Sequence, residues 1–332
     1  MPVVAPLAIS MGDPAGIGPE VIAKAWARRE TEALPCFFAV GDVRAVSQVW
    51  TGPVERIDDP RDAAKVFNRA LPVVSVVDGD AIVPGRPDIG GARCALQSLE
   101  LAVGLARSDA ASGLVTAPIS KAELYRVGFT YPGQTEFVAE RCGVARENAV
   151  MMLAGPTLRV VPITIHEPLA DVPSTLTVEL IVARARTTAR GLTRDFGIAA
   201  PRLTLAGLNP HAGESGAIGR EEIEVMQPAV AQLRAEGIDI VGPLAADTMF
   251  HPRARAKYDA ALCAYHDQAL IPIKTLHFDD GVNITLGLPI VRTSPDHGTA
   301  FDIAGEDVAE PGAMIAAIRM AGEAAARRAA VA

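Results

Sequence analysis

The chain has 332 residues, of which 49% are hydrophobic and 21% are charged, a composition typical of a folded globular protein. Its 31 basic and 39 acidic residues give a formal charge of −8, which argues against the broad basic surface of a nucleic-acid-binding protein. Aromatic residues make up only 5%, too few to favour a platform that stacks single-stranded bases. At roughly 150 residues per domain, the length predicts two domains.

The cysteines and the N-terminus indicate the compartment. Cys36, Cys94, Cys142 and Cys263 lie far apart and form no CxxC pair, so free thiols in a reducing compartment are expected. The first basic residue is Lys24, so the basic flank of a signal peptide is missing. No apolar run approaches the roughly 18 residues of a membrane helix. These features predict a cytoplasmic protein without a membrane span.

In the first part of the chain, short apolar runs alternate with amphipathic segments. Strands are expected at 7–11, 36–40, 71–77 and 113–116, and helices at 19–29, from residue 42 onward and at 90–108. This alternation is typical of an α/β fold with a largely parallel sheet.

The second part has a different pattern. Apolar runs at 149–154 and 159–165 flank Gly155 and Pro156, which predicts an antiparallel hairpin or meander. We expect helices at 176–196, ended by Gly197, and at 220–236, strands at 203–207 and 261–265, and a terminal surface helix at 311–332.

A glycine-rich loop, residues 11–20, separates the first expected strand from the first helix. Gly16 and Gly18 begin a G-x-G-x-x-G pattern, but Val21 stands where the third glycine is required. The loop therefore lacks the dinucleotide fingerprint of a Rossmann fold. Two interpretations remain: a tight turn, or a backbone that lines a ligand cleft at the carboxyl end of a strand.

Three of the six histidines directly follow strand-like runs. His166, His211 and His266 each stand after an apolar segment. Because a parallel sheet collects the carboxyl ends of its strands at one edge, these imidazoles could hold a divalent ion with positions open for substrate. The alternative for each is a hydrogen-bonded structural histidine.

Two further features suggest ligand binding. Lys274, Asn283 and Arg292 emerge from apolar surroundings, which suits recognition of a phosphate or carboxylate, although surface charge at strand ends would give the same pattern. The loop 296–305 precedes the terminal helix. It could be a structural cap, but it also resembles the adenosine-contacting loop of isopropylmalate and isocitrate dehydrogenases, which bind NAD(P) without a Rossmann motif.

Taken together, ordered segments along nearly the whole chain resemble the 4-hydroxythreonine-4-phosphate dehydrogenase family of pyridoxal 5'-phosphate biosynthesis. The matching segments are residues 12–20, 115–121, 133–137, 209–214, 246–248, 265–268 and 282–287. The resemblance implies two α/β domains of the isocitrate/isopropylmalate dehydrogenase type rather than a Rossmann fold. It also implies a homodimer whose active site lies at the interface, with metal histidines from both subunits. We expect residues 1–130 with 290–332 to form the cofactor domain, and 131–289 the metal, substrate and dimer-interface domain.

The resemblance also assigns roles to single residues. It implies metal ligation by His166, His211 and His266, and substrate binding by Thr135, Lys274, Asn283 and Arg292. The likeness of the loop 296–305 to that of isopropylmalate and isocitrate dehydrogenases implies cofactor binding by Gly298, Thr299 and Asp302. Gln134 stands where many members have histidine. Because an amide does not titrate near neutrality, we expect Gln134 to bind substrate rather than relay a proton. Asp247 and Asp267 are candidates for the catalytic base or for partners of the metal ligands, although a structural role for each is equally open.

The implied reaction is metal-assisted oxidation of the C3 hydroxyl of 4-phosphohydroxy-L-threonine by NAD or NADP, followed by decarboxylation to 3-amino-2-oxopropyl phosphate. One zinc, cobalt or magnesium ion would assist it. Related enzymes that act on D-threonate or D-erythronate 4-phosphate, or on aromatic dihydrodiols, are alternatives. A phosphate acetyltransferase-like enzyme is a more distant alternative, as is a metal-binding protein without catalytic activity.

Overall fold

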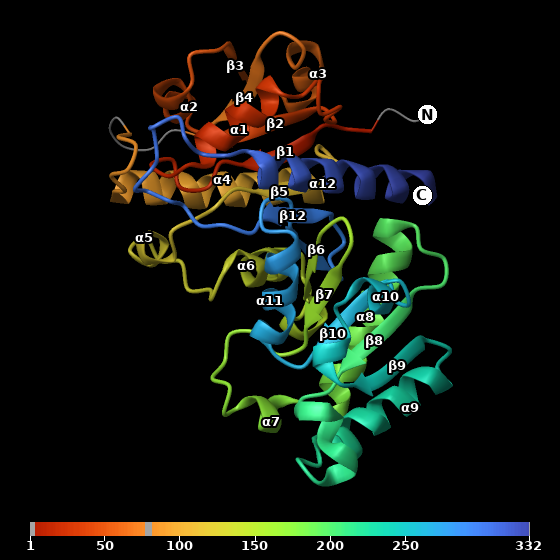
Figure 1. Ribbon diagram of the computed structural model, residues 1–332. Coiled ribbons are helices and arrows are strands. Elements are labelled where there is room, and N and C mark those ends of the chain that lie inside the picture. Colours follow the sequence, from red (N-terminus) through yellow and green to blue (C-terminus); the bar gives the residue numbers. More distant parts are fainter. Residues whose placement is uncertain (1–3, 77–81, 332) are drawn as a thin grey trace. The chain divides into compact units, whose positions relative to one another are not determined.

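The computed structural model describes residues 4–76 and 82–331, and the chain divides into two units (Figure 1). One unit comprises residues 1–143 and 288–332, and the other comprises residues 144–287. The structure thus groups residues 131–143 with the first unit, whereas the sequence suggests that they begin the second. Among the described residues, no helix combines the length and the apolar character needed to cross a membrane.

The first unit is built on a parallel sheet with the strand order β3-β4-β2-β1-β5-β12. The strands are β1 (Leu7–Ser10), β2 (Phe37–Gly41), β3 (Val54–Ile57), β4 (Leu71–Ser75), β5 (Leu114–Thr116) and β12 (Arg292–Pro295). Every residue of β1, β2, β5 and β12 is buried, as expected for central strands covered on both faces. Val77, expected to end one strand, lies outside the described residues.

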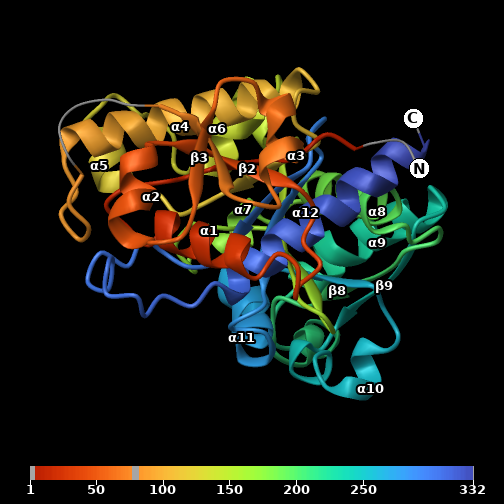
Figure 2. The same ribbon diagram turned by 90° about the horizontal axis from the view of Figure 1, so that it is seen from above.

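Helices cover both faces of this sheet. The helices of the first unit are α1 (Gly18–Ala27), α2 (Val43–Val49), α3 (Ala63–Val66), α4 (Ile89–Arg107), α5 (Lys121–Tyr125), α6 (Gln134–Arg141) and α12 (Gly312–Val331), with a short turn η1 (Pro60–Asp62). Figure 2 shows α4 on one side of the strands and α1 with α12 on the other. The expectation of a surface helix at the C-terminus is wrong, because α12 packs on β12 and β5 through alanines and the buried Met314 and Ile318.

The second unit has a mixed sheet with the strand order β11-β6-β7-β10-β8-β9. The strands are β6 (Val150–Ala154), β7 (Arg159–Pro162), β8 (Arg202–Ala206), β9 (Asp239–Leu244), β10 (Ala260–Cys263) and β11 (Val282–Leu286). The predicted hairpin is confirmed, since β6 pairs with β7 in antiparallel register, Leu153 opposite Val160. Strand β6 is also antiparallel to β11, whereas the pairs β7–β10, β10–β8 and β8–β9 are parallel.

The helices of the second unit largely follow the sequence pattern. They are α7 (Val172–Thr175), α8 (Val178–Phe196), α9 (Gln227–Ala235), α10 (Pro252–Arg255) and α11 (His266–Leu276), with short turns η2 (Arg146–Asn148), η3 (Pro210–Gly216) and η5 (Ala246–Thr248). Helix α8 ends at Gly197, whose φ of 71° gives the left-handed cap that the sequence predicts. The helix expected at 220–236 begins instead with a π-helical segment, η4 (Glu222–Met226). The predicted α/β class is thus confirmed, and all four cysteines are free thiols, as expected.

Candidate active site

The sheet of the second unit places the three candidate metal histidines after neighbouring strands. Strand β10 lies between β7 and β8, and all three are parallel. His166 follows β7, His266 begins α11 just after β10, and His211 lies in η3 after β8. Since parallel strands end at the same edge, the topology brings all three residues to that edge of the unit.

Only two of these histidines lie close together. The imidazole rings of His166 and His266 have centroids 5.6 Å apart and line a pocket of about 430 Å³, with Thr164, Tyr265 and Asp267 also in its wall. Within the ranges that the structure describes, no three His, Cys, Asp or Glu side chains are grouped closely enough to hold a metal ion. The described residues of this chain therefore form a histidine pair, and His211 does not join it.

Carboxylates orient two of the imidazoles. Nδ1 of His266 lies 2.7 Å from a carboxylate oxygen of Asp267, and Nδ1 of His211 lies 2.7 Å from one of Glu214. A carboxylate at Nδ1 favours the tautomer in which Nδ1 carries the proton and Nε2 presents a lone pair, the usual arrangement of metal-binding histidines. The chemistry of these imidazoles thus suits a divalent ion, although only two of the three lie together in the part of the chain that the structure describes. Glu214 was missed by the sequence reasoning, although it lies three residues after His211 in a segment that carries the family resemblance.

The two candidate aspartates have different surroundings. Asp267 is hydrogen-bonded to His266, so the geometry favours an orienting role for it. Asp247 is exposed in η5, and η5 contacts the turn η3 that carries His211.

A buried arginine organises the candidate anion site of the first unit. The side chain of Arg292, at the start of β12, is 3% exposed. It donates to the hydroxyl of Thr116 at 2.7 Å, to Oε1 of Gln134 at 3.2 Å and to the hydroxyl of Thr135 at 3.3 Å. Burial lowers the pKa of Arg292 to about 10, which leaves it charged at neutral pH. The structure thus brings together three predicted substrate residues and adds Thr116, the last residue of β5.

Lys274 and Asn283, the other predicted substrate residues, belong to the second unit. Lys274 lies half-buried on α11, and Asn283 is on β11. The amide oxygen of Asn283 is buried and has no hydrogen-bond partner among the described residues. A buried acceptor left unsatisfied is costly unless a ligand donates to it, so Asn283 is a credible binding residue.

The two glycine-bearing loops of the first unit contact each other. The backbone N–H of Ile17 donates to the carbonyl of Thr299 at 2.9 Å, and a Cβ at Gly16 would stand 2.8 Å from the same oxygen. The carboxylate of Glu20, 1% exposed, accepts from the N–H groups of Gly305 at 3.3 Å and Ala309 at 3.1 Å. The loop 11–20 therefore supports the candidate cofactor loop, in which Gly298 and Asp302 are exposed.

A buried carboxylate lies in the first of these loops. Asp13 is 2% exposed and accepts a hydrogen bond from the N–H of Ala15 at 3.1 Å. Burial, together with the negative charges of Glu123 and Asp88, raises the pKa of Asp13 from 3.8 to about 6. Asp13 was not among the sequence-predicted site residues.

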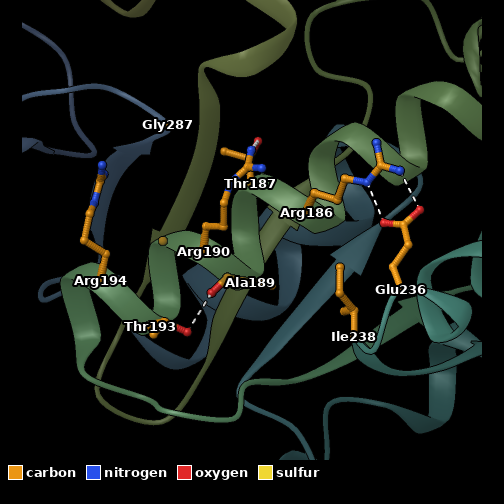
Figure 3. A pocket seen from close by; sticks show the side chains of 10 residues that line it. Arg186, Thr187, Ala189, Arg190, Thr193, Arg194, Glu236, Ile238 and Gly287 are labelled. Carbon is orange, nitrogen blue, oxygen red and sulfur yellow. Dashed lines mark hydrogen bonds and ion pairs between the residues drawn. The ribbon is translucent and has the colours of Figure 1, made fainter.

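A larger pocket of about 700 Å³ in the second unit contains none of the predicted site residues. Figure 3 shows three arginines of α8 along it, Arg186, Arg190 and Arg194. Arg186 forms a two-point ion pair with Glu236 at 2.7 and 2.5 Å, and Arg194 pairs with Asp195. Since Arg186 and Arg194 are neutralised by Glu236 and Asp195, this pocket is a weaker candidate for an anion-binding site than the surroundings of Arg292.

An α/β fold with a buried arginine among polar side chains and histidines at the carboxyl ends of its strands is typical of enzymes that bind small ligands. Comparison with known proteins specifies the family. The family model "Pyridoxal phosphate biosynthetic protein PdxA" matches residues 34–321. The 4-hydroxythreonine-4-phosphate dehydrogenase of Zymomonas mobilis is 59% identical over 323 residues, covering 97% of this chain and 96% of that protein. The enzyme of the same name from Erythrobacter litoralis is 57% identical and covers 98% of each chain.

Solved structures are similar to this chain over nearly its whole length. The 4-hydroxythreonine-4-phosphate dehydrogenase of Klebsiella pneumoniae superposes with a TM-score of 0.88 at 36% identity, covering 97% of this chain and 98% of that one. A terephthalate 1,2-cis-dihydrodiol dehydrogenase from Burkholderia xenovorans superposes with a TM-score of 0.67 at 30% identity, covering 96% and 98%. The chain belongs to the PdxA family of pyridoxal phosphate biosynthetic proteins, which confirms the resemblance seen in the sequence.

Proposed function

We propose that this enzyme oxidises the C3 hydroxyl of 4-phosphohydroxy-L-threonine with NAD or NADP, and that the product loses carbon dioxide to give 3-amino-2-oxopropyl phosphate. The observation that carries the proposal is the 59% identity, over nearly the whole chain, to an enzyme named for this substrate. The family suggests a nicotinamide cofactor and a metal ion. The proposed setting is the bacterial cytoplasm.

The surroundings of Arg292 support a phosphorylated substrate. A guanidinium presents a planar set of donors that matches phosphate oxygens, and its burial strengthens the attraction to an anion. The hydroxyls of Thr116 and Thr135 and the amide of Gln134 fix the orientation of this group. In the second unit, Lys274 would offer a cation to a substrate anion, and the unsatisfied oxygen of Asn283 would accept a hydrogen bond from a substrate ammonium or hydroxyl.

The histidine edge supports a metal site. His166 and His266 would hold one divalent ion, with zinc or cobalt preferred by imidazole ligands and magnesium as an alternative. A bound ion supplies Lewis-acid chemistry that lowers the pKa of the substrate hydroxyl. Because His211 does not join the pair within one protomer, we propose that a homodimer completes the set with His211 from across the interface. Asp267 would hold His266 in its ligating orientation, and Asp247 is the candidate base.

The loop 296–305 is the proposed cofactor contact, through Gly298, Thr299 and Asp302. Its position is fixed by the hydrogen bond from Ile17 to Thr299 and by the carboxylate of Glu20. Hydride transfer itself belongs to the nicotinamide, so the role of these residues is to place the cofactor.

The test is NADH and NADPH formation on a panel of substrates. The panel contains 4-phosphohydroxy-L-threonine, D-threonate 4-phosphate, D-erythronate 4-phosphate and an aromatic cis-dihydrodiol, each with enzyme before and after chelation. We expect turnover of the first compound, lost on chelation and restored by a divalent ion. Strong turnover of another member of the panel, with none of the first, would overturn the proposed substrate.

A further inference from the structure

The turn that carries His211 has an unusual backbone. Five consecutive residues, 211–215, have positive φ angles of 51°, 53°, 78°, 45° and 58°. Only one of them, Gly213, is a glycine, and the left-handed region is unfavourable for the other four because Cβ approaches the following carbonyl. Such a run persists only where the surrounding structure determines it, and strained backbone of this kind gathers at ligand-binding segments.

A buried carboxylate holds the start of this turn. Glu222 is 1% exposed, and one of its oxygens accepts from the backbone N–H of Asn209 at 2.7 Å. The other accepts from the Asn209 side-chain amide at 3.0 Å, and the same amide donates to Glu221 at 2.7 Å. Asn209 is the residue that precedes η3. Glu222 therefore fixes the residue from which the left-handed run begins.

The same carboxylate also lies against the middle of the turn. A Cβ built at Gly213 would stand 2.6 Å from Oε2 of Glu222, so only glycine permits this approach. Glu222 itself opens the π-helical segment η4, and segments of this kind are frequent at functional sites. The carboxylate thus contacts the turn on both sides of His211, at Asn209 and at Gly213.

We propose that Glu222 is a positioning residue for metal binding: it holds the left-handed turn 211–215 and thereby sets the direction of His211. The proposal rests on the proposed function in one respect, that His211 is a metal ligand. A glutamine at this position keeps the volume but has one carbonyl oxygen in place of two acceptors, so it turns an N–H donor toward Asn209. The turn would lose one of its hydrogen bonds between Asn209 and Glu222, and the imidazole of His211 would no longer be oriented toward the metal ion.

The experiment is calorimetric titration of the chelated full-length protein with cobalt(II), followed by the visible spectrum of the bound ion. The variants are Glu222→Gln, His211→Ala and the matched control Glu224→Gln, an exposed glutamate of the same segment that pairs with Arg220. We expect Glu222→Gln to weaken cobalt binding by about 10- to 100-fold, the usual effect of removing a residue that orients a metal ligand. Glu224→Gln should bind as the wild type does, and the metal-free variants should melt alike.

The outcomes separate this inference from the proposed function. Wild-type affinity in His211→Ala would show that His211 is not a ligand, and both the metal assignment and the inference would fail. Weak binding by His211→Ala with wild-type affinity in Glu222→Gln would leave the metal assignment standing and overturn the inference. If Glu222→Gln does not fold, Gly213→Ala tests the same contact from the other side. It should weaken cobalt binding, and unchanged affinity in this folded variant would equally overturn the inference.

Discussion

The buried guanidinium of Arg292 donates a hydrogen bond to the side-chain oxygen of Gln134 at 3.2 Å, while the amide nitrogen of Gln134 donates to the carbonyl of Ala117 at 3.0 Å. Both the oxygen and the nitrogen of the Gln134 amide are therefore hydrogen-bonded, and an amide does not titrate near neutral pH. That Gln134 binds substrate rather than relaying a proton stays a prediction, and the two substitutions below test it.

Replacing Gln134 by glutamate should weaken substrate binding. The new carboxylate would pair with Arg292 and compete with the substrate anion, so the KM should rise by about tenfold or more, the effect of a charged hydrogen bond of about 1.5–3 kcal/mol. The kcat should change much less. Steady-state kinetics with the phosphorylated substrate measure the split, and an unchanged KM would show that the substrate does not bind at Arg292.

Replacing Gln134 by histidine should introduce an ionisation near pH 6.5 in the activity profile, since imidazole titrates there. The activity should stay within the range of the wild type. A large gain in kcat for Gln134→His would contradict the assigned role, because it would indicate that this position relays a proton in the reaction.

Replacing Arg292 by lysine should raise the KM for substrate by at least tenfold. Lysine keeps the charge but loses the planar fork that reaches Thr116, Gln134 and Thr135 together. Arg190→Lys, in the larger pocket of Figure 3, is the matched control and should have no effect on KM. An unchanged KM in Arg292→Lys together with a raised KM in Arg190→Lys would place the substrate anion at the arginines of α8.

Replacing Glu20 by glutamine should affect the cofactor selectively. The variant loses charge-assisted bonds to Gly305, Ala309 and Lys24, so the loop 296–305 should be held less firmly. The KM for NAD or NADP should rise severalfold, while the KM for substrate stays unchanged. Glu30→Gln, which alters an exposed ion pair with Arg29, is the control. A rise in the substrate KM alone would contradict the role given to the loop.

The raised pKa of Asp13 predicts a pH-dependent stability. Since the folded-state pKa is about 6 and the ordinary value is 3.8, the folded protein holds this proton more tightly than the unfolded chain. The resulting stabilisation is complete below pH 3.8 and is lost as the pH rises through 6. A pKa difference of about 2 between the folded and unfolded states corresponds to about 2–3 kcal/mol in the free energy of unfolding.

Asp13→Asn should remove this dependence and keep the hydrogen bond from Ala15. Urea unfolding between pH 4 and pH 8 should show a smaller loss of stability with rising pH in the variant, which should exceed the wild type at pH 8 by up to about 2–3 kcal/mol. Asp58→Asn, an exposed surface change, is the control. Parallel stability curves for the wild type and Asp13→Asn would refute the assignment.

Much of the fold could be predicted from the sequence because its determinants are local. Turn residues at Gly155 and Pro156 predicted the hairpin of β6 and β7, and Gly197 predicted the end of α8. The burial of α12 could not be predicted in this way. Alanine is compatible with a surface helix or with close packing on a sheet, and only the neighbouring strands β5 and β12 decide between them.

The sequence predicted which residues belong to the candidate site, but not which of them lie next to one another. Arg292 contacts Gln134 and Thr116 across sequence separations of 158 and 176 residues, which no local pattern reveals. Glu222 was missed for the same reason, since its role depends on a turn that begins 13 residues earlier. The three histidines share one sheet edge as expected, but the spacing of residues along the chain could not show that only His166 and His266 are adjacent.

The most direct test of the account is the rate of NADH or NADPH formation from 4-phosphohydroxy-L-threonine by the wild type and by His166→Ala, each chelated and then resupplied with a divalent ion. The account predicts turnover by the wild type that disappears on chelation and returns with the ion, and none by His166→Ala, whose fold is checked by circular dichroism. Turnover that persists after chelation and in a folded His166→Ala variant would contradict it.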